Sequence, residues 1–351
     1  MSSRKYWIIN KWYLSFYIYR ILIASVLFFN LIPGVQPADA LNFNSGINST
    51  YTGYAIGLSS TNIILYLNIL SNSIFGQYFS FIFYTSIVSY TCIKLCENIN
   101  FSKRYILLTI FCLPTFSLFS VGLNKEFFII IFISSFVIYI ISKRNLLLLL
   151  FLLLVTIFIK PQVALIVICY FIFDKLKKLK NNLIDIRYLT IFSAFFIFTI
   201  LFLKFSDELF VYLQIVKSHF SDDGNATRDI IFFENKYSYI TSSIKGIYYL
   251  LFGPTIYEAL NLKQGLLIFI ENIYIISFII YNTKKFDFTI INSSRIYLFF
   301  SIFFVSFLVI YPAAIYNFVS AIRYRIPILI LLIFYFLYSK NNHEKKSFNI
   351  Y

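Results

Sequence analysis

The sequence predicts an all-helical, polytopic membrane protein, and three observations support this fold class. The 351-residue chain is 60% hydrophobic and only 13% charged, with a mean hydropathy of +0.79. A soluble domain is nearer half apolar and a quarter charged, so this excess cannot be buried in one water-soluble core. Apolar runs of spanning length recur between charge clusters, and basic residues concentrate in alternate connections. Both patterns are typical of membrane helix bundles.

A helix needs about 20 predominantly apolar residues to cross the hydrocarbon core of a bilayer. By this criterion we predict about ten spans, at residues 13–33, 75–95, 105–122, 127–142, 145–159, 162–173, 188–205, 264–281, 294–313 and 326–339. The exact helix count stays open around 127–173, where the spans are short or closely joined, and around 55–75. The first span contains Arg20 and is long, which favours a retained signal-anchor helix over a cleaved signal peptide.

Basic residues set the predicted orientation. With both termini in the cytoplasm, 19 lysines and arginines lie in inside segments, 10 lie in outside segments and Arg20 lies in the first helix. Acidic residues show the opposite preference. The net charge of +15 therefore faces the cytoplasm, where anionic lipid is its expected partner. A nucleic-acid partner is not needed to explain it.

The polar remainder of the chain lies in outer loops and a short tail. We predict one integral-membrane domain over 1–339, with periplasmic loops at about 34–74, 206–263 and 314–325, and a cytoplasmic tail at 340–351. The largest loop joins the seventh and eighth helices. The stretch 243–254 is too short to span and is expected to lie in the interface or to re-enter the membrane.

Several familiar chemistries leave no trace in the sequence. It contains no Walker A loop, dinucleotide-binding glycine motif, HExxH or nucleophile elbow, which argues against ATP-driven transport by this chain alone. Its four cysteines fall in or near predicted membrane segments, so neither a disulfide framework nor a cysteine metal site is expected.

Two charges stand in the stretch GLNKEFF, between the third and fourth spans: Lys125 and Glu126. One interpretation is a plain helix cap, with Asn124 as the N-cap and an acid in the first turn. The other is that a tight turn holds both charges at the outer rim of the bundle, facing a cavity where a polar substrate meets the membrane. Both interpretations stay open at this point.

Further cations lie at predicted outer helix ends. Lys160 in FIKPQ ends the fifth span before Pro161, and snorkelling of its amine to the outer interface is the simplest expectation. Arg323 and Arg325 in IRYRIP open the last span, on the side where positive charge is disfavoured. If this stretch is extended, both guanidiniums point one way, and their planar forks suit a phosphate or pyrophosphate.

Four other charged residues are candidates. Asp39 is the only carboxylate in the first outer loop and forms either an Asx-type turn or a general base or metal ligand. Arg228 lies in the large loop, where a solvated position is the alternative. Arg20 and Glu271 fall within predicted helices, where charges are costly and tend to be paired or functional. Pairing with each other is one expectation for these two.

Three stretches together resemble bacterial O-antigen and capsular polysaccharide polymerases: DALNFNSGINSTYTGYAIG after the first helix, GLNKEFF opening the fourth and IRYRIPILI opening the last. These polymerases are integral-membrane glycosyltransferases, and the resemblance covers most of the chain as a topology. It implies polymerisation of undecaprenyl-pyrophosphate-linked repeat units at the periplasmic face of the bacterial inner membrane. Lipid-linked glycans are the implied substrates, and flippase and chain-length regulator proteins are the implied partners. No cofactor is firmly implied, and a divalent metal stays open.

This reaction needs cations for the developing pyrophosphate charge and a group that accepts the acceptor hydroxyl's proton. The expected catalytic residues are Asp39, Glu126, Arg323 and Arg325, with Asp39 or Glu126 as the base. The expected substrate-binding residues are Lys125, Lys160, Arg228 and Tyr311. Two alternatives remain: a polyprenyl-phosphate-sugar-dependent glycosyltransferase that does not polymerise, and a flippase or transporter of lipid-linked oligosaccharides. The scarcity of charges deep in the helices favours an enzyme over a transporter.

Overall fold

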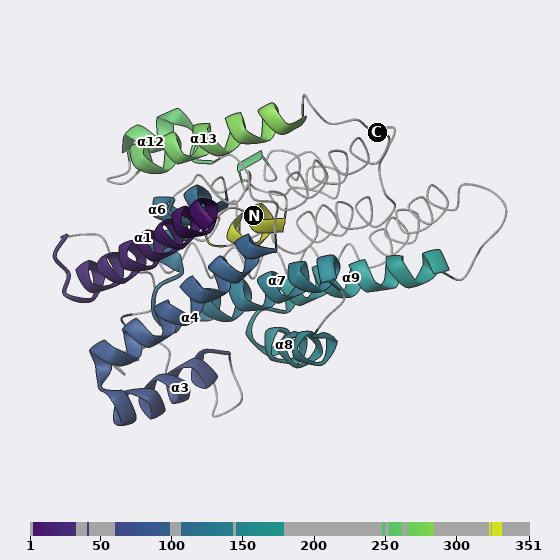
Figure 1. Ribbon diagram of the computed structural model, residues 1–351, viewed down its shortest axis with the longest axis horizontal. Helices are drawn as coiled ribbons and strands as arrows, with labels where there is room; N and C mark the ends of the chain where they lie inside the picture. The colour runs from purple at the N-terminus through teal and green to yellow at the C-terminus, as the bar shows by residue number, and fades with distance from the viewer. Residues whose placement is uncertain are drawn as a thin grey trace, which may run out of the picture. The chain divides into compact units, whose positions relative to one another are not determined.

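The computed structural model describes residues 3–32, 41, 60–98, 107–142, 145–178, 248–249, 253–261, 265–283, 323 and 325–331. Within these residues the chain forms helices and turns and no strand (Figure 1), which confirms the all-helical class. The chain divides into two compact units. Unit 1 comprises Met1–Pro161 with Phe336–Tyr351, and unit 2 comprises Gln162–Tyr335.

Three helices in the described part of the chain are long and apolar enough to cross a membrane. They are Lys11–Phe28 within α1 (Ser3–Phe28), α4 (Gln77–Glu97) and α7 (Lys125–Ser142). Shorter apolar stretches occur in α3 (Ser60–Phe75), α8 (Leu146–Ile159), α9 (Pro161–Lys178) and α13 (Gly265–Thr283). These helices support a membrane protein.

Most predicted helices in the described residues are found. The helices predicted at 75–95, 127–142, 145–159 and 264–281 agree within about two residues, the usual boundary error, with α4, α7, α8 and α13. The first helix begins earlier and ends earlier than predicted, and α9 continues beyond 173. The predicted spans 188–205 and 294–313 lie outside the described residues, and the last is described, as helix, only to residue 331.

The prediction of one helix over 105–122 is wrong, because the chain breaks at Pro114. Residues 107–111 are helical, and α6 (Pro114–Phe119) follows as a separate short helix. Proline lacks an N–H and disfavours helical geometry in the residue before it. Leu113 accordingly has φ −60° and ψ 144°, and Pro114 occupies the start of α6, the helix position that proline tolerates best.

The loop predicted at 34–74 contains a helix, α3. Its buried residues Ile64, Asn68 and Ser71 recur at helical spacing, so one stripe packs inward. Tyr66, Leu70 and Ile74 remain exposed, as expected of a helix that meets lipid or the interface. Gly76 separates α3 from α4 with φ +78°, a conformation that glycine adopts readily.

Helices α1 and α4 run antiparallel in unit 1. The Phe28 ring near the end of α1 lies 5.3 Å from that of Tyr78 and 5.6 Å from that of Phe81, near the start of α4. Further along, the Tyr17 hydroxyl donates to Ser86 Oγ at 2.8 Å. Helix α7 packs against both α4 and α8.

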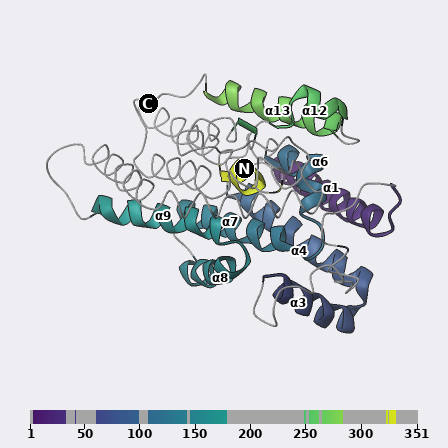
Figure 2. The ribbon, with the colours of Figure 1, turned by 180° about the vertical axis from the view of Figure 1, so that it is seen from behind.

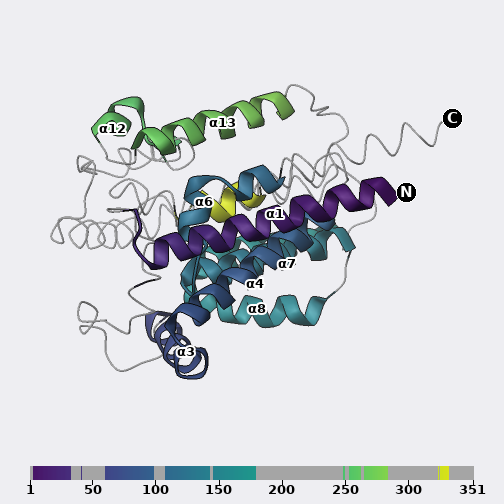
Figure 3. The same ribbon diagram turned by 60° about the vertical axis from the view of Figure 1, so that its left-hand side comes forward.

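Three helix ends predicted to face outward lie together in unit 1: the end of α6, the start of α7 and the end of α8. The turn before α7 contacts α4 through Thr85, and the end of α8 contacts the start of α7 through Lys160 and Glu126. Helix α3 contacts both α4 and α8 (Figure 3). However, Thr85 lies about 12 Å along α4 from Gln77, at about 1.5 Å per residue. The charged turn is therefore set back from the start of α4 rather than standing at the outermost rim.

In unit 2, α12 (Ile256–Asn261) packs against α13 (Figure 2). Thr255 and Glu258 form a capping box, in which the Thr255 N–H donates to Glu258 Oε2 at 2.8 Å and the Glu258 N–H donates to Thr255 Oγ1 at 3.4 Å. A Cβ on Gly265 would lie only 2.4 Å from the Ala259 carbonyl oxygen. Glycine therefore permits the close approach of the two helices.

Candidate functional site

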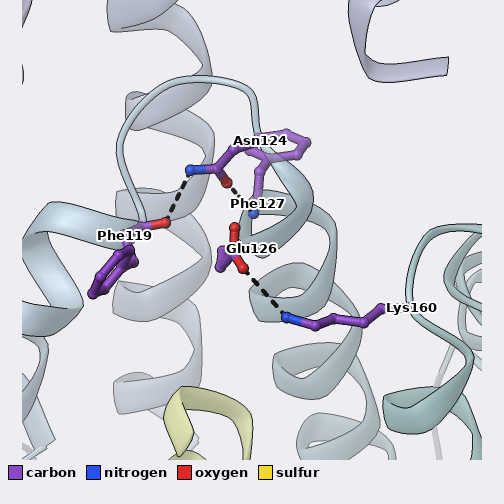
Figure 4. A network of polar contacts seen from close by, with 5 residues as sticks. All are labelled: Phe119, Asn124, Glu126, Phe127 and Lys160. Atoms are coloured by element: carbon purple, nitrogen blue, oxygen red, sulfur yellow. Dashed lines mark hydrogen bonds and ion pairs between the residues drawn. The ribbon is translucent and has the colours of Figure 1, made fainter. Parts of the chain in front are cut away.

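The turn 120–124 is closed by its own asparagine. Asn124 Oδ1 accepts from the Phe127 N–H at 2.8 Å, and Asn124 Nδ2 donates to the carbonyls of Phe119 at 3.0 Å and Val121 at 3.3 Å (Figure 4). The first bond satisfies one of the unpaired N–H groups at the start of α7. This confirms Asn124 as the N-cap and places Glu126 in the first turn of the helix.

Glu126 forms a buried ion pair with Lys160. Lys160 Nζ lies 3.3 Å from Glu126 Oε1, and the two residues are only 6% and 1% exposed (Figure 4). The expectation that Lys160 snorkels to the interface is therefore wrong, because its ammonium turns inward to Glu126. The pair fastens the end of α8 to the start of α7. Lys125, between the buried Asn124 and Glu126, is only half-buried.

Two side chains from other helices also bind the turn. Thr85 Oγ1 in α4 accepts from the Gly122 N–H at 3.0 Å, and Asn68 Nδ2 in α3 donates to the Leu123 carbonyl at 3.3 Å. Gly122 has φ +64°, and a Cβ there would meet the Phe81 ring at 2.5 Å. Asn68 and Thr85 are not among the site residues predicted from the sequence. The available signal was a polar residue inside an apolar helical run, which must find a partner when buried.

Arg20 is the deepest cation of α1 and is fully buried. Its Nη1 donates to the Ser117 carbonyl at 3.3 Å and its Nη2 donates to the Ser120 carbonyl at 2.8 Å, while its guanidinium lies 5.5 Å from the Phe116 ring centroid. The last carbonyls of a helix have no partner inside that helix. Arg20 supplies partners for the end of α6, which explains a charge at this depth.

A second buried cluster, in unit 2, forms around Arg325. Its Nη1 donates to the Gly253 carbonyl at 3.0 Å and also to Asn272 Oδ1, and Asn272 Nδ2 donates to the same Gly253 carbonyl at 2.6 Å. The Glu271 carboxylate interacts electrostatically with Arg325. All three side chains are buried. Arg20 and Glu271 thus each have a partner within their own unit.

The expectation of an extended R-Y-R stretch is wrong, because Arg323 and Arg325 are both helical. Neither residue therefore has the extended backbone under which both guanidiniums would point one way. Arg325 is buried, whereas Arg323 is half-buried. Their guanidiniums therefore do not form the parallel pair that the extended geometry predicted.

The structure brings together Glu126 and Lys160, with Lys125 beside them, and places Arg325 on Asn272. Three expected site residues, Asp39, Arg228 and Tyr311, lie outside the described residues. Among the residues that are described, no three His, Cys, Asp or Glu side chains form a group that could hold a metal ion.

No family model, curated protein or solved structure matches the chain.

Proposed function

We propose that the chain is a membrane glycosyltransferase that joins undecaprenyl-pyrophosphate-linked oligosaccharide repeat units at the periplasmic face of the bacterial inner membrane. The observation that carries this proposal is the setting of Lys125. Lys125 is half-buried at the first residue of α7, and its neighbours Asn124 and Glu126 are buried. A cation at a helix N-terminus opposes the helix dipole, so the dipole does not account for a lysine at the first residue of α7. Lys125 adds to the positive end of the helix, which suits an anionic ligand.

Pyrophosphate is the anion that this reaction supplies. In the proposed transfer, an acceptor hydroxyl oxygen bonds to the anomeric carbon of the donor sugar as the bond from that carbon to the lipid pyrophosphate breaks. The pyrophosphate leaves with the electron pair, and a carboxylate accepts the hydroxyl proton. Lys125 stabilises the negative charge that develops on the leaving group. Asp39 is the proposed base, because the Glu126 carboxylate is buried against Lys160.

The arrangement of unit 1 supports an outward site. The helix ends next to Lys125 all belong to connections predicted to be periplasmic, and the turn meets α4 at Thr85, about 12 Å from the start of that helix. Lys94, in the last turn of α4, is predicted to be cytoplasmic. Positive charge is disfavoured on the outer side of a membrane, so a half-buried lysine there suggests a functional role.

The test is a polysaccharide gel from cells that lack the gene, complemented with the wild type, Lys125→Ala or Lys94→Ala at matched protein levels. We expect Lys125→Ala to shorten the ladder strongly while a single repeat unit still reaches the surface. Lys94→Ala is the matched control, because it removes an exposed lysine from the last turn of α4, away from the contact between Thr85 and the turn before Lys125. This variant should leave the ladder unchanged.

Three other outcomes would redirect the proposal. Loss of even the single repeat unit in the deletion strain would indicate a flippase or an earlier step. A normal ladder that lacks one sugar decoration would indicate a transferase that does not polymerise. An unchanged ladder in the deletion strain would overturn the polymerase.

A further inference from the structure

The turn before Lys125 is bound by side chains of three helices that are distant in sequence, and one of them is Arg20 of α1, which donates to the Ser120 carbonyl at 2.8 Å. Thr85 and Asn68 reach it from 37 and 55 residues away, and both side chains are buried. We propose that Asn68 and Thr85 are positioning residues, which fix the position of Lys125 at the N-terminal end of α7. This inference rests on the function proposed for Lys125, and it makes α3 part of the site rather than a loop outside it.

The local bonds of the turn cannot do this alone. Asn124 binds the last residue of α6, the turn itself and the first turn of α7, so it joins neighbouring segments but does not tie them to α3 or α4. The Glu126–Lys160 pair ties α7 to α8. Among the bonds described, those from Thr85, Asn68 and Arg20 tie the turn's backbone to α4, α3 and α1, and the first two hold its residues nearest to Lys125.

Neither helix needs these polar atoms for its own stability. Thr85 Oγ1 also donates to the Phe81 carbonyl at 2.9 Å, and Asn68 Nδ2 also donates to the Ile64 carbonyl at 3.3 Å. Both carbonyls lie one turn back, where the helix backbone already supplies a donor. Polar groups are costly in an apolar interior unless they are bonded. The distinctive contribution of the Thr85 and Asn68 side chains is therefore their contact with the turn.

The Thr85 bond is the sharper of the two to test. If its oxygen is removed, the buried Gly122 N–H loses the acceptor that it has here, which is more costly than the loss of an exposed bond. Thr85→Val removes the oxygen and keeps the shape, whereas Thr85→Ser keeps the oxygen. Thr91→Val is the matched control, because Thr91 Oγ1 in the same helix donates to the Ile87 carbonyl at 2.8 Å, the same kind of bond one turn back.

The position of residue 125 can be measured without any transferase assay. Lys125→Cys is placed in the full chain with its four native cysteines replaced by alanine, and intact cells are treated with a membrane-impermeant maleimide. We expect Thr85→Val to change the labelling rate about tenfold, in line with the loss of one buried bond. Thr85→Ser and Thr91→Val should keep the parent rate. In chains that retain Lys125, Thr85→Val should also shorten the polysaccharide ladder, and Thr85→Ser should restore it.

Each outcome decides between the alternatives. An unchanged labelling rate in Thr85→Val overturns the positioning role, as does a changed rate with a full-length ladder. If Thr85→Val does not reach the membrane at the parent level, Asn68→Leu takes its place and is judged by the same two measurements. A normal ladder in Lys125→Ala overturns the proposed function of Lys125 instead. The labelling rate would still report whether Thr85 fixes the position of residue 125, because that measurement does not depend on transferase activity.

Discussion

Unit 1 contains two lysine–glutamate pairs of the same chemistry in opposite surroundings. In α4, Lys94 Nζ lies 2.8 Å from Glu97 Oε2, and the two side chains are 43% and 39% exposed. Between α7 and α8, Lys160 Nζ lies 3.3 Å from Glu126 Oε1, and the side chains are 8% and 1% exposed. Lys94 and Glu97, the pair with the shorter distance, lie one turn apart on the same helix and are exposed. Lys160 and Glu126, the pair with the longer distance, join two helices in the interior. Solvent exclusion, and not distance, decides which pair the structure depends on.

Breaking the buried pair should have the largest effect. Lys160→Met keeps the length of the side chain but leaves the Glu126 carboxylate buried beside an apolar group. Removing one partner of a buried pair costs about 3–5 kcal/mol. We expect a large drop in the thermal midpoint of the purified protein in a fixed detergent, together with a lower level in the membrane.

The matched control is the double variant Glu126→Leu/Lys160→Met, which removes both charges together. Replacement of a whole buried pair by apolar residues is often neutral or stabilising, so most of the thermal midpoint should return. A double variant as unstable as Lys160→Met would show that the pair itself, and not an isolated buried charge, holds α7 on α8.

The sequence predicts helices α7 and α8 but not the ion pair that joins them. The apolar runs locate α7 and α8, and Asn124 and Pro161 mark where the helices begin. Glu126 and Lys160 are 34 residues apart, and no local pattern shows that their side chains turn toward each other. That choice depends on how α7 packs against α8, which also turns Lys160 away from the interface where its length alone would place it.

The misplaced elements have similar causes. The predominantly apolar run at 105–122 concealed the break at Pro114, because hydropathy measures only transfer to lipid and ignores the missing N–H. Helix α3 appeared as a loop because its inward stripe carries Asn68 and Ser71, which lower its hydropathy but bond to neighbouring carbonyls when buried. Mean hydropathy therefore misses both features, because one depends on the local geometry of proline and the other on hydrogen bonds made after burial.

A substitution of Gly122, in the turn before α7, should have an intermediate effect on the thermal midpoint. Gly122→Ala would place a methyl group 2.5 Å from the Phe81 ring in a residue with φ +64°. Left-handed backbone costs a residue with a side chain roughly 1–2 kcal/mol, and the displaced ring adds to that. We expect a clear fall in the thermal midpoint, smaller than that of Lys160→Met. Gly76→Ala is the control, since its φ is +78° but nothing lies within 4 Å of its added Cβ, so the difference between the two variants measures the contact with Phe81.

The smallest effect is expected at the exposed pair. Lys94→Ala removes an exposed ion pair within one helix, which typically contributes about 0.3–0.5 kcal/mol. The thermal midpoint should therefore move little, and what difference there is should shrink as salt is raised, because salt screens exposed charges far more than buried ones. The midpoint difference between Lys160→Met and wild type should change much less over the same salt range. If Lys94→Ala and Lys160→Met instead lowered the midpoint equally, burial would not separate the two pairs, and Glu126–Lys160 would have to be treated as an ordinary surface contact.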